Sequence, residues 1–281
     1  MSKTLLRISG FFLLILLIVS LQVAIDRRRV IREELVEELL YFPSGDFIQG
    51  KVGGFDLLVA DWIWLRAIQY YGHHRLTDAK FKYLGHILDV LTTLDPRFIH
   101  AYTFGSLLLT HDAGEPLKAF QLLKKGREKN PHRWEIPFME GFIHYVFLKR
   151  YREAVRSFRL SSHLPDSPDM TRRFAAFAAK KGGETRLSLE LWMELYQTSK
   201  NPYEKETALR YVKQLKKKEV EGLLATYVSQ RGTYPLDLSE LLSLHPIGEL
   251  KSLFEAPDGD RLYYNRKTHE VFWNKEEIKG Q

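Results

Sequence analysis

The feature that most constrains this chain is an apolar run near its start. Residues 8–25 read ISGFFLLILLIVSLQVAI, with Lys3 and Arg7 before the run and three arginines, 27–29, after it. About 18 helical residues extend roughly 27 Å, which is close to the hydrocarbon thickness of a bilayer. Leu, Ile, Phe and Val side chains outweigh the few polar groups in the run. The run therefore predicts a single transmembrane helix, with the rest of the chain as an aqueous domain tethered to it.

A cleaved secretory signal peptide is the alternative, because it also has a basic start and an apolar stretch. Residues 22–24 are Gln-Val-Ala, which is not an A-x-A-like cleavage site, and the run exceeds the usual apolar length of a signal peptide. We therefore expect an uncleaved anchor. Basic residues on both sides leave its orientation ambiguous. Because a short N-terminal tail usually stays in the cytosol, we expect residues 1–7 to be cytoplasmic and the bulk of the chain to be periplasmic, at a bacterial inner membrane.

Composition fits an anchored globular protein, since 44% of the 281 residues are hydrophobic and 27% are charged. The absence of cysteine excludes disulfides, thiolate metal sites and cysteine nucleophiles. The net charge of +7 is dispersed over mixed runs such as residues 124–129. This pattern favours a mildly basic surface near anionic lipid and no nucleic-acid binding.

Glycine and proline punctuate the chain after the anchor. Residues 26–54 are expected to form a juxtamembrane helix and a linker, because apolar residues recur at helical spacing until Pro43. From residue 55 the chain is almost continuously helical. Gly105 precedes a helix with Ala119 and then Pro131, and the same order follows Gly141. Small residues let paired helices approach closely, and proline ends the second helix. Degenerate units over residues 57–96, with a loop at 72–78, and over residues 174–202 complete the pattern.

This arrangement resembles the tetratricopeptide-repeat family over roughly residues 57–202. The resemblance implies a mainly α fold, with an αα-hairpin solenoid of about four units in residues 55–202 and capping helices over residues 203–230. Glu140 departs from the family pattern, because it occupies a normally apolar position.

The family resemblance also implies that a protein or peptide partner binds a concave face lined by the first helix of each unit. The corresponding positions in this chain are Trp64, Ile68, Tyr71, Tyr102, Ser106, Leu109, Phe138, Phe142, Tyr145, Arg173, Phe177 and Lys180. The aromatic rings suit apolar side chains, and the cations at the basic end suit a carboxylate. In the alternative, the N-terminal helix or the C-terminal module covers Trp64, Phe138 and Phe142.

Residues 231–281 change in character and predict a small α+β module. A short helix at residues 236–244, introduced by Asp237, precedes two strands, 261–264 and 270–273, joined by a loop to form a hairpin. This order resembles the C-terminal part of pseudopilin-like modules. A small unrelated hairpin that closes the solenoid is the alternative.

Catalytic motifs are absent from the sequence, which has no G-x-S-x-G, Walker loop, dinucleotide fingerprint or H-E-x-x-H. His73 and His74 are expected to be a solvated loop pair. Asp258 and Asp260 flank a glycine without the glutamate of a calcium loop, so they predict a turn. We therefore expect no enzyme activity, no cofactor and no metal.

The expected function is a membrane-anchored scaffold or adaptor for partner proteins in an envelope process such as secretion or pilus assembly. The first alternative is a stoichiometric structural subunit of a membrane complex, whose transmembrane helix packs against other subunits. The second is an enzyme with carboxylates or histidines converging in the groove.

Overall fold

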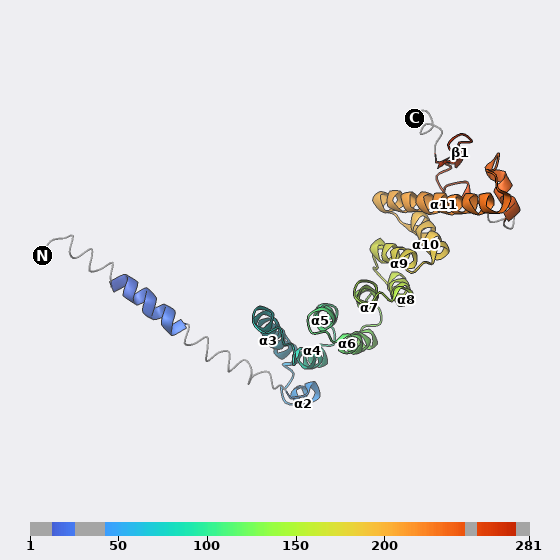
Figure 1. Cartoon of the computed structure of the whole chain (residues 1–281). Coiled ribbons are helices and arrows are strands. Elements are labelled where there is room, and N and C mark those ends of the chain that lie inside the picture. The colour runs from blue at the N-terminus through green and yellow to red at the C-terminus, as the bar shows by residue number, and fades with distance from the viewer. Residues whose placement is uncertain (1–12, 26–42, 245–251, 274–281) are drawn as a thin grey trace, which may run out of the picture. The chain divides into compact units, whose positions relative to one another are not determined.

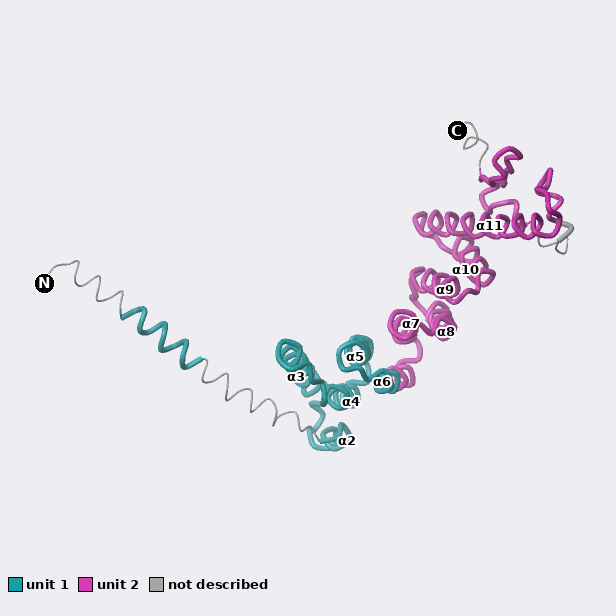
Figure 2. The backbone as a smooth tube through the Cα atoms, in the orientation of Figure 1, with its two compact units in different colours: residues 1–122 teal, residues 123–281 magenta. Residues whose placement is uncertain are grey.

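The computed structural model describes residues 13–25, 43–244 and 252–273, and these are mainly helical (Figure 1), which confirms the predicted class at this level. The chain divides into two compact units, residues 1–122 and 123–281 (Figure 2). Residues 13–25 form a helix with exposed side chains. Across the described ranges, no helix combines the length and apolar character needed to cross a membrane. Residues 8–12 of the predicted anchor and residues 26–42 of the predicted juxtamembrane segment lie outside those ranges.

Helix α4 is the centre of unit 1. It contacts three other helices, because its apolar side chains Leu84, Ile87, Leu88 and Leu91 lie at helical spacing and are almost fully buried. Besides the helix at residues 13–25, the helices of this unit are α2 (Gly45–Gln49), α3 (Asp56–Leu76), α4 (Leu84–Leu94), α5 (Ile99–His111) and the first part of α6 (Pro116–Lys129). The short helix α2 lies within the predicted linker, where the sequence indicated none.

Helix α3 is longer than expected and corrects the predicted loop at residues 72–78. The helix continues to Leu76 because the ring of His74 packs on Tyr70, with centroids 4.3 Å apart, and its Nδ1 lies 2.7 Å from Asp78 Oδ1. His74 is buried. The prediction of a solvated histidine pair is therefore wrong, and the loop begins at Thr77.

The close helix approach predicted at two glycines is confirmed. A Cβ atom on Gly105 would lie 2.8 Å from both methyl carbons of Leu88. A Cβ on Gly141, in unit 2, would lie 2.7 Å from Cδ1 of Phe158. Distances below 3.0 Å leave no room for a side chain, so glycine permits the packing of these helices.

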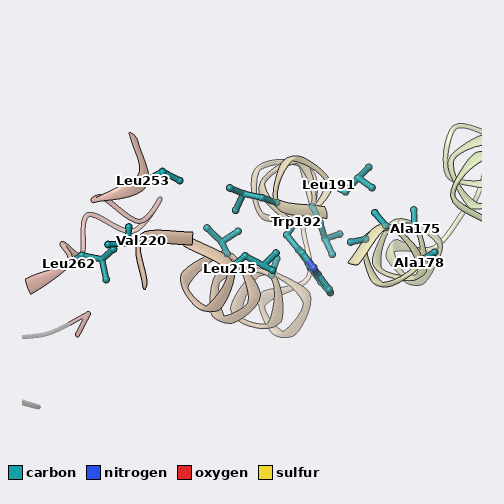
Figure 3. Packing of buried hydrophobic residues seen from close by; sticks show 14 of the residues in the cluster. Ala175, Ala178, Leu191, Trp192, Leu215, Val220, Leu253 and Leu262 are labelled. Carbon is teal, nitrogen blue, oxygen red and sulfur yellow. The ribbon is translucent and has the colours of Figure 1, made fainter. Parts of the chain in front are cut away.

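Unit 2 is a succession of helices in which, from α7 to α11, each packs against the next. They are the second part of α6, α7 (Glu135–Val146), α8 (Tyr151–Ser162), α9 (Asp169–Lys181), α10 (Thr185–Thr198) and α11 (Pro202–Arg231). In the core, Trp192 of α10 lies between Leu215 of α11 and the small residues Ala175 and Ala178 of α9 (Figure 3). The predicted capping segment corresponds to α11, a single helix of 30 residues.

The C-terminal module is fastened to α11. Lys216 Nζ donates hydrogen bonds to the backbone oxygens of Ser252 and Glu255 at 2.5 and 2.7 Å, and Trp273 Nε1 donates to the Lys213 oxygen at 2.8 Å. The module contains a 3₁₀ helix, η1 (Leu238–Leu244), and the antiparallel strands β1 (Tyr263–Tyr264) and β2 (Val271–Phe272). The predicted hairpin is confirmed with shorter strands, whereas the predicted short helix is a 3₁₀ helix.

Candidate partner-binding surface

Aromatic side chains gather on α7 and α9 of unit 2. Phe138, Phe142 and Tyr145 occupy positions i, i+4 and i+7 of α7, so they share one side of the helix. Their ring centroids lie between 5.4 and 6.4 Å from that of Phe174 on α9. All four side chains are half-buried. We call these four residues the aromatic surface.

The ring of Phe158 on α8 forms the floor of the aromatic surface. It is fully buried, and its centroid lies 5.4 Å from those of Phe138 and Phe174 and 6.4 Å from that of Tyr145. These separations lie within the range that aromatic pairs favour. Since Gly141 lets α8 approach α7, it also holds Phe158 in this position. The surface is therefore supported from beneath by a packed core.

Titratable groups on α7 add little charge to the aromatic surface. Burial raises the pKa of Tyr145, so its hydroxyl stays protonated and can donate a hydrogen bond. Burial lowers the pKa of His144, which favours the neutral ring. Glu140 forms an ion pair with Arg127 at 3.0 Å, and burial raises the pKa of its carboxyl group. The aromatic surface thus suits apolar side chains better than charged ones.

The basic end of the predicted groove is engaged within the protein. Arg173 Nη1 donates to Oε1 of Glu204 on α11 at 2.8 Å, and Glu204 is buried. Lys180 Nζ donates to Oε1 of Gln214 at 3.4 Å. In the structure, a carboxylate of the chain itself pairs with Arg173, at the position where the sequence predicted a partner's carboxylate.

Phe177 likewise contacts neighbouring helices. Its ring lies edge-on to Trp192 of α10 and Tyr211 of α11, with centroids 5.1 and 5.2 Å away. Tyr211 also stacks on Trp192 at 4.5 Å. Side chains of α11 therefore contact the three residues of α9 that the sequence assigned to partner binding.

Unit 1 holds the first predicted triad in mixed surroundings. Trp64 is half-buried, with its ring centroid 5.2 Å from Phe98, and Tyr71 donates to Asp112 Oδ2 at 3.2 Å. Ile68 is 47% exposed. The ring of Trp64 is thus packed by a residue of its own unit, as Phe138 and Phe142 are in unit 2.

The second predicted triad is buried, which corrects its assignment to an open groove. Tyr102, Ser106 and Leu109 are each at most 1% exposed. The Tyr102 hydroxyl donates to the backbone oxygens of Thr92 and Pro96, both at 3.3 Å, and burial raises its pKa to about 12. These side chains are in the core because this side of α5 packs against α4.

Sequence reasoning missed Phe174 and Phe158 as parts of the surface. Phe174 lies between two residues that the family pattern selected, Arg173 and Phe177. The sequence did contain a signal for Phe174. An aromatic residue in the first helix of one repeat unit can extend the aromatic side formed by Phe138 in the first helix of the unit before it. The family pattern identifies positions within a helix, whereas the ring contacts between α7 and α9 determine which side chains meet.

The acidic pair of the C-terminal module is occupied by a lysine. Lys213 Nζ lies 2.6 Å from Asp258 Oδ2 and 2.5 Å from Asp260 Oδ2, and Gly259 between them has a φ of 91°. The predicted turn is confirmed. Among the residues that the structure describes, no cluster of three or more His, Asp or Glu side chains has an arrangement that could hold a metal ion.

No protein-family model matches this sequence, and no curated protein matches it.

Proposed function

We propose that this protein is a membrane-anchored scaffold of the tetratricopeptide-repeat type, and that it binds a partner protein or peptide on the aromatic surface. The repeat assignment is supported by the close packing at Gly105 and Gly141. It is also supported by contacts at the family's spacing of about 34 residues. Lys180 and Gln214 are 34 positions apart, and Arg173 and Glu204 are 31 apart.

The observation that carries the binding proposal is the partial exposure of four aromatic rings above the buried ring of Phe158. Phe138, Phe142, Tyr145 and Phe174 are partly accessible, although their partners in the core are buried. Aromatic anchors of this kind dominate the energy of many protein interfaces, because they bury large areas at a low cost in conformational entropy. The partner is therefore expected to insert apolar side chains.

The proposal includes the location of the scaffold. Residues 8–25 cross a bacterial inner membrane, and the bulk of the chain lies in the periplasm. The support is the length and apolar composition of the run. Secretion or pilus assembly is the proposed process, and the order of elements in the C-terminal module supports it. Two C-terminal fusions test the topology: one to a reporter that is active only outside the cytoplasm and one to a reporter that is active only inside it. Activity of the cytoplasmic reporter alone overturns the proposed topology.

In-cell crosslinking tests the binding proposal. A photoreactive amino acid at Phe142 or Tyr145 should capture a specific protein, whereas the same group at exposed Leu160 on α8 should not. In a second arm, the photoreactive group at Phe142 is combined with Tyr145→Ala, and Leu160→Ala is the matched control. Capture from position 142 should be lost with Tyr145→Ala and retained with Leu160→Ala.

An unchanged set of captured proteins in Tyr145→Ala, with the fold retained, overturns binding at the aromatic surface. The alternative, a structural subunit of a membrane complex, has a different expected result. The protein would then co-purify with fixed partners at fixed stoichiometry and at high salt, whichever aromatic residue is replaced.

A further inference from the structure

One side of α3 carries large apolar side chains that the fold leaves exposed. Leu57, Leu58, Leu65 and Ile68 are between 47% and 66% exposed, and we call these four residues the α3 apolar face; Phe55, the N-cap residue before the helix, is 65% exposed. The opposite side of the helix supplies buried core residues, namely Ala60, Ile63, Ala67 and Tyr70. A helix that is apolar on both sides is normally covered on both sides. The α3 apolar face is therefore suited to contact another apolar phase or molecule.

The chain itself keeps α3 close to the proposed membrane. Residues 26–42, which follow the apolar run, reach at most about 60 Å even when fully extended. Helix α3 begins soon afterwards, at Asp56. If residues 8–25 are in the bilayer, the α3 apolar face is therefore always within a short tether of the lipid surface. Such a tether gives the bilayer a high effective concentration compared with any diffusing partner.

Cations beside exposed rings favour lipid as the occupant. Lys51 Nζ lies 5.6 Å from the ring centroid of Phe47, which is 58% exposed. The guanidinium of Arg66 lies 5.1 Å from the ring of Trp62, which is 40% exposed. Membrane interfaces combine these groups, because aromatic rings lie at headgroup level and cations bind lipid phosphates. Protein–protein interfaces are also enriched in arginine and aromatic residues but depleted of lysine, so the pair of Lys51 and Phe47 is the one that favours lipid over protein.

Polar residues limit how deeply the helix can enter. Asp61 and Gln69 are exposed on the same side of α3 as Leu65. An ionised carboxylate is costly in hydrocarbon but tolerated among headgroups. The expected position is thus parallel to the membrane, at the boundary between headgroups and acyl chains.

We propose that the α3 apolar face lies on the anionic surface of the bilayer that holds residues 8–25. This inference rests on the proposed anchor. It adds that unit 1 has a fixed orientation on the membrane, because it has a second attachment besides the tether.

Spin labelling of the full chain tests this contact. The chain has no cysteine, so a single introduced cysteine carries the only label. Leu65→Cys and Leu58→Cys probe the α3 apolar face, Leu16→Cys probes the anchor, and exposed Gln121→Cys on α6 is the aqueous control. Each variant is reconstituted in phosphatidylcholine vesicles that contain phosphatidylglycerol. Collision rates with oxygen, which concentrates in lipid, and with a water-soluble nickel chelate give the depth of each label.

The expected result is an ordered series. The ratio of oxygen to nickel collisions should be highest at Leu16, severalfold above the aqueous value at Leu65 and Leu58, and lowest at Gln121. If Leu65 matches Gln121 while Leu16 is in lipid, the inference is overturned and the anchor stands. If Leu16 is also aqueous, the anchor fails, and the inference fails with it.

Two other occupants have their own signatures, and both overturn the inference. Spin–spin broadening at Leu65 that disappears on dilution with unlabelled chain indicates a second copy. Low collision rates with both reagents, without such broadening, indicate that another segment of the chain covers the face.

Discussion

Replacing Gly141 by alanine tests whether close helix packing supports the aromatic surface. The new Cβ would lie 2.7, 2.8 and 3.0 Å from three ring carbons of Phe158. That ring is fully buried and surrounded by other aromatic rings, so it has little room to move. Overpacking of this kind costs about 1–3 kcal/mol. The better helix propensity of alanine returns about 1 kcal/mol, which leaves a net loss of about 0–2 kcal/mol.

Gly222 is the matched control. It lies inside α11 of the same unit, is exposed, and a Cβ there would meet no heavy atom within 4 Å. Gly222→Ala should therefore stabilise the protein by up to about 1 kcal/mol. The two substitutions have the same chemistry, so the difference between them, about 1–3 kcal/mol, measures the overpacking alone.

Hydrogen exchange of the full chain in mild detergent, followed by mass spectrometry, measures the protection of backbone amides in α8 and in α11 separately. Gly141→Ala should lower protection in α8, and Gly222→Ala should raise it in α11. Combining Gly141→Ala with Phe158→Leu should cost less than the sum of the two changes, because the smaller side chain relieves the clash. If Gly141→Ala stabilises the protein as much as Gly222→Ala, the reasoning is refuted.

Three further predictions concern buried charges in unit 2. Burial raises the pKa of Glu140 above its ordinary value of 4.5, so the contribution of its carboxyl group to stability is present below that value and is lost as the pH rises through the raised pKa. In urea titrations, the wild type should therefore lose free energy of unfolding relative to Glu140→Gln as the pH rises above 4.5. Arg173→Ala leaves the carboxylate of Glu204 buried without its cation and should cost about 1–3 kcal/mol, whereas Lys181→Ala, at an exposed position, should change stability by less than about 0.5 kcal/mol in the same titrations. Lys216→Met removes the donor to two backbone oxygens of the C-terminal module, and limited proteolysis should then cut that module faster while α11 stays intact; equal cleavage rates would show that this lysine does not fasten it.

Local signals in the sequence predicted much of the fold. Residues at both ends of α11 mark its limits. The Asn201 side chain caps the start of the helix, next to Pro202, and Gly232 adopts a φ of 73° at its end. The hairpin was also predicted, from the aromatic pairs Tyr263-Tyr264 and Phe272-Trp273 on either side of a polar loop. The end of α3 was not, since the helix continues through Gly72 owing to contacts of His74 with Tyr70 and Asp78.

The candidate surface was predicted less well, because it depends on which helices pack together. A family pattern gives the position of a residue in its helix but not the neighbour that covers it. Tyr102 entered the core because α5 packs against α4, and Arg173 was neutralised because α11 places Glu204 beside it. Phe138 and Phe142 remain partly accessible, and their neighbour on α9 is another partly accessible ring, Phe174.

The succession of helices in unit 2 has a consequence for how the protein is made. Since each helix from α7 to α11 packs against the next one along the chain, most contacts form between residues that are close in sequence. Chains with such local contacts pay little entropy to close loops and fold quickly. Successive helix pairs can therefore become stable as they emerge from the ribosome or from a membrane channel, before the C-terminal module has been released. Little apolar surface then stays exposed until a segment distant in sequence has been made, which reduces the time during which the new chain can aggregate.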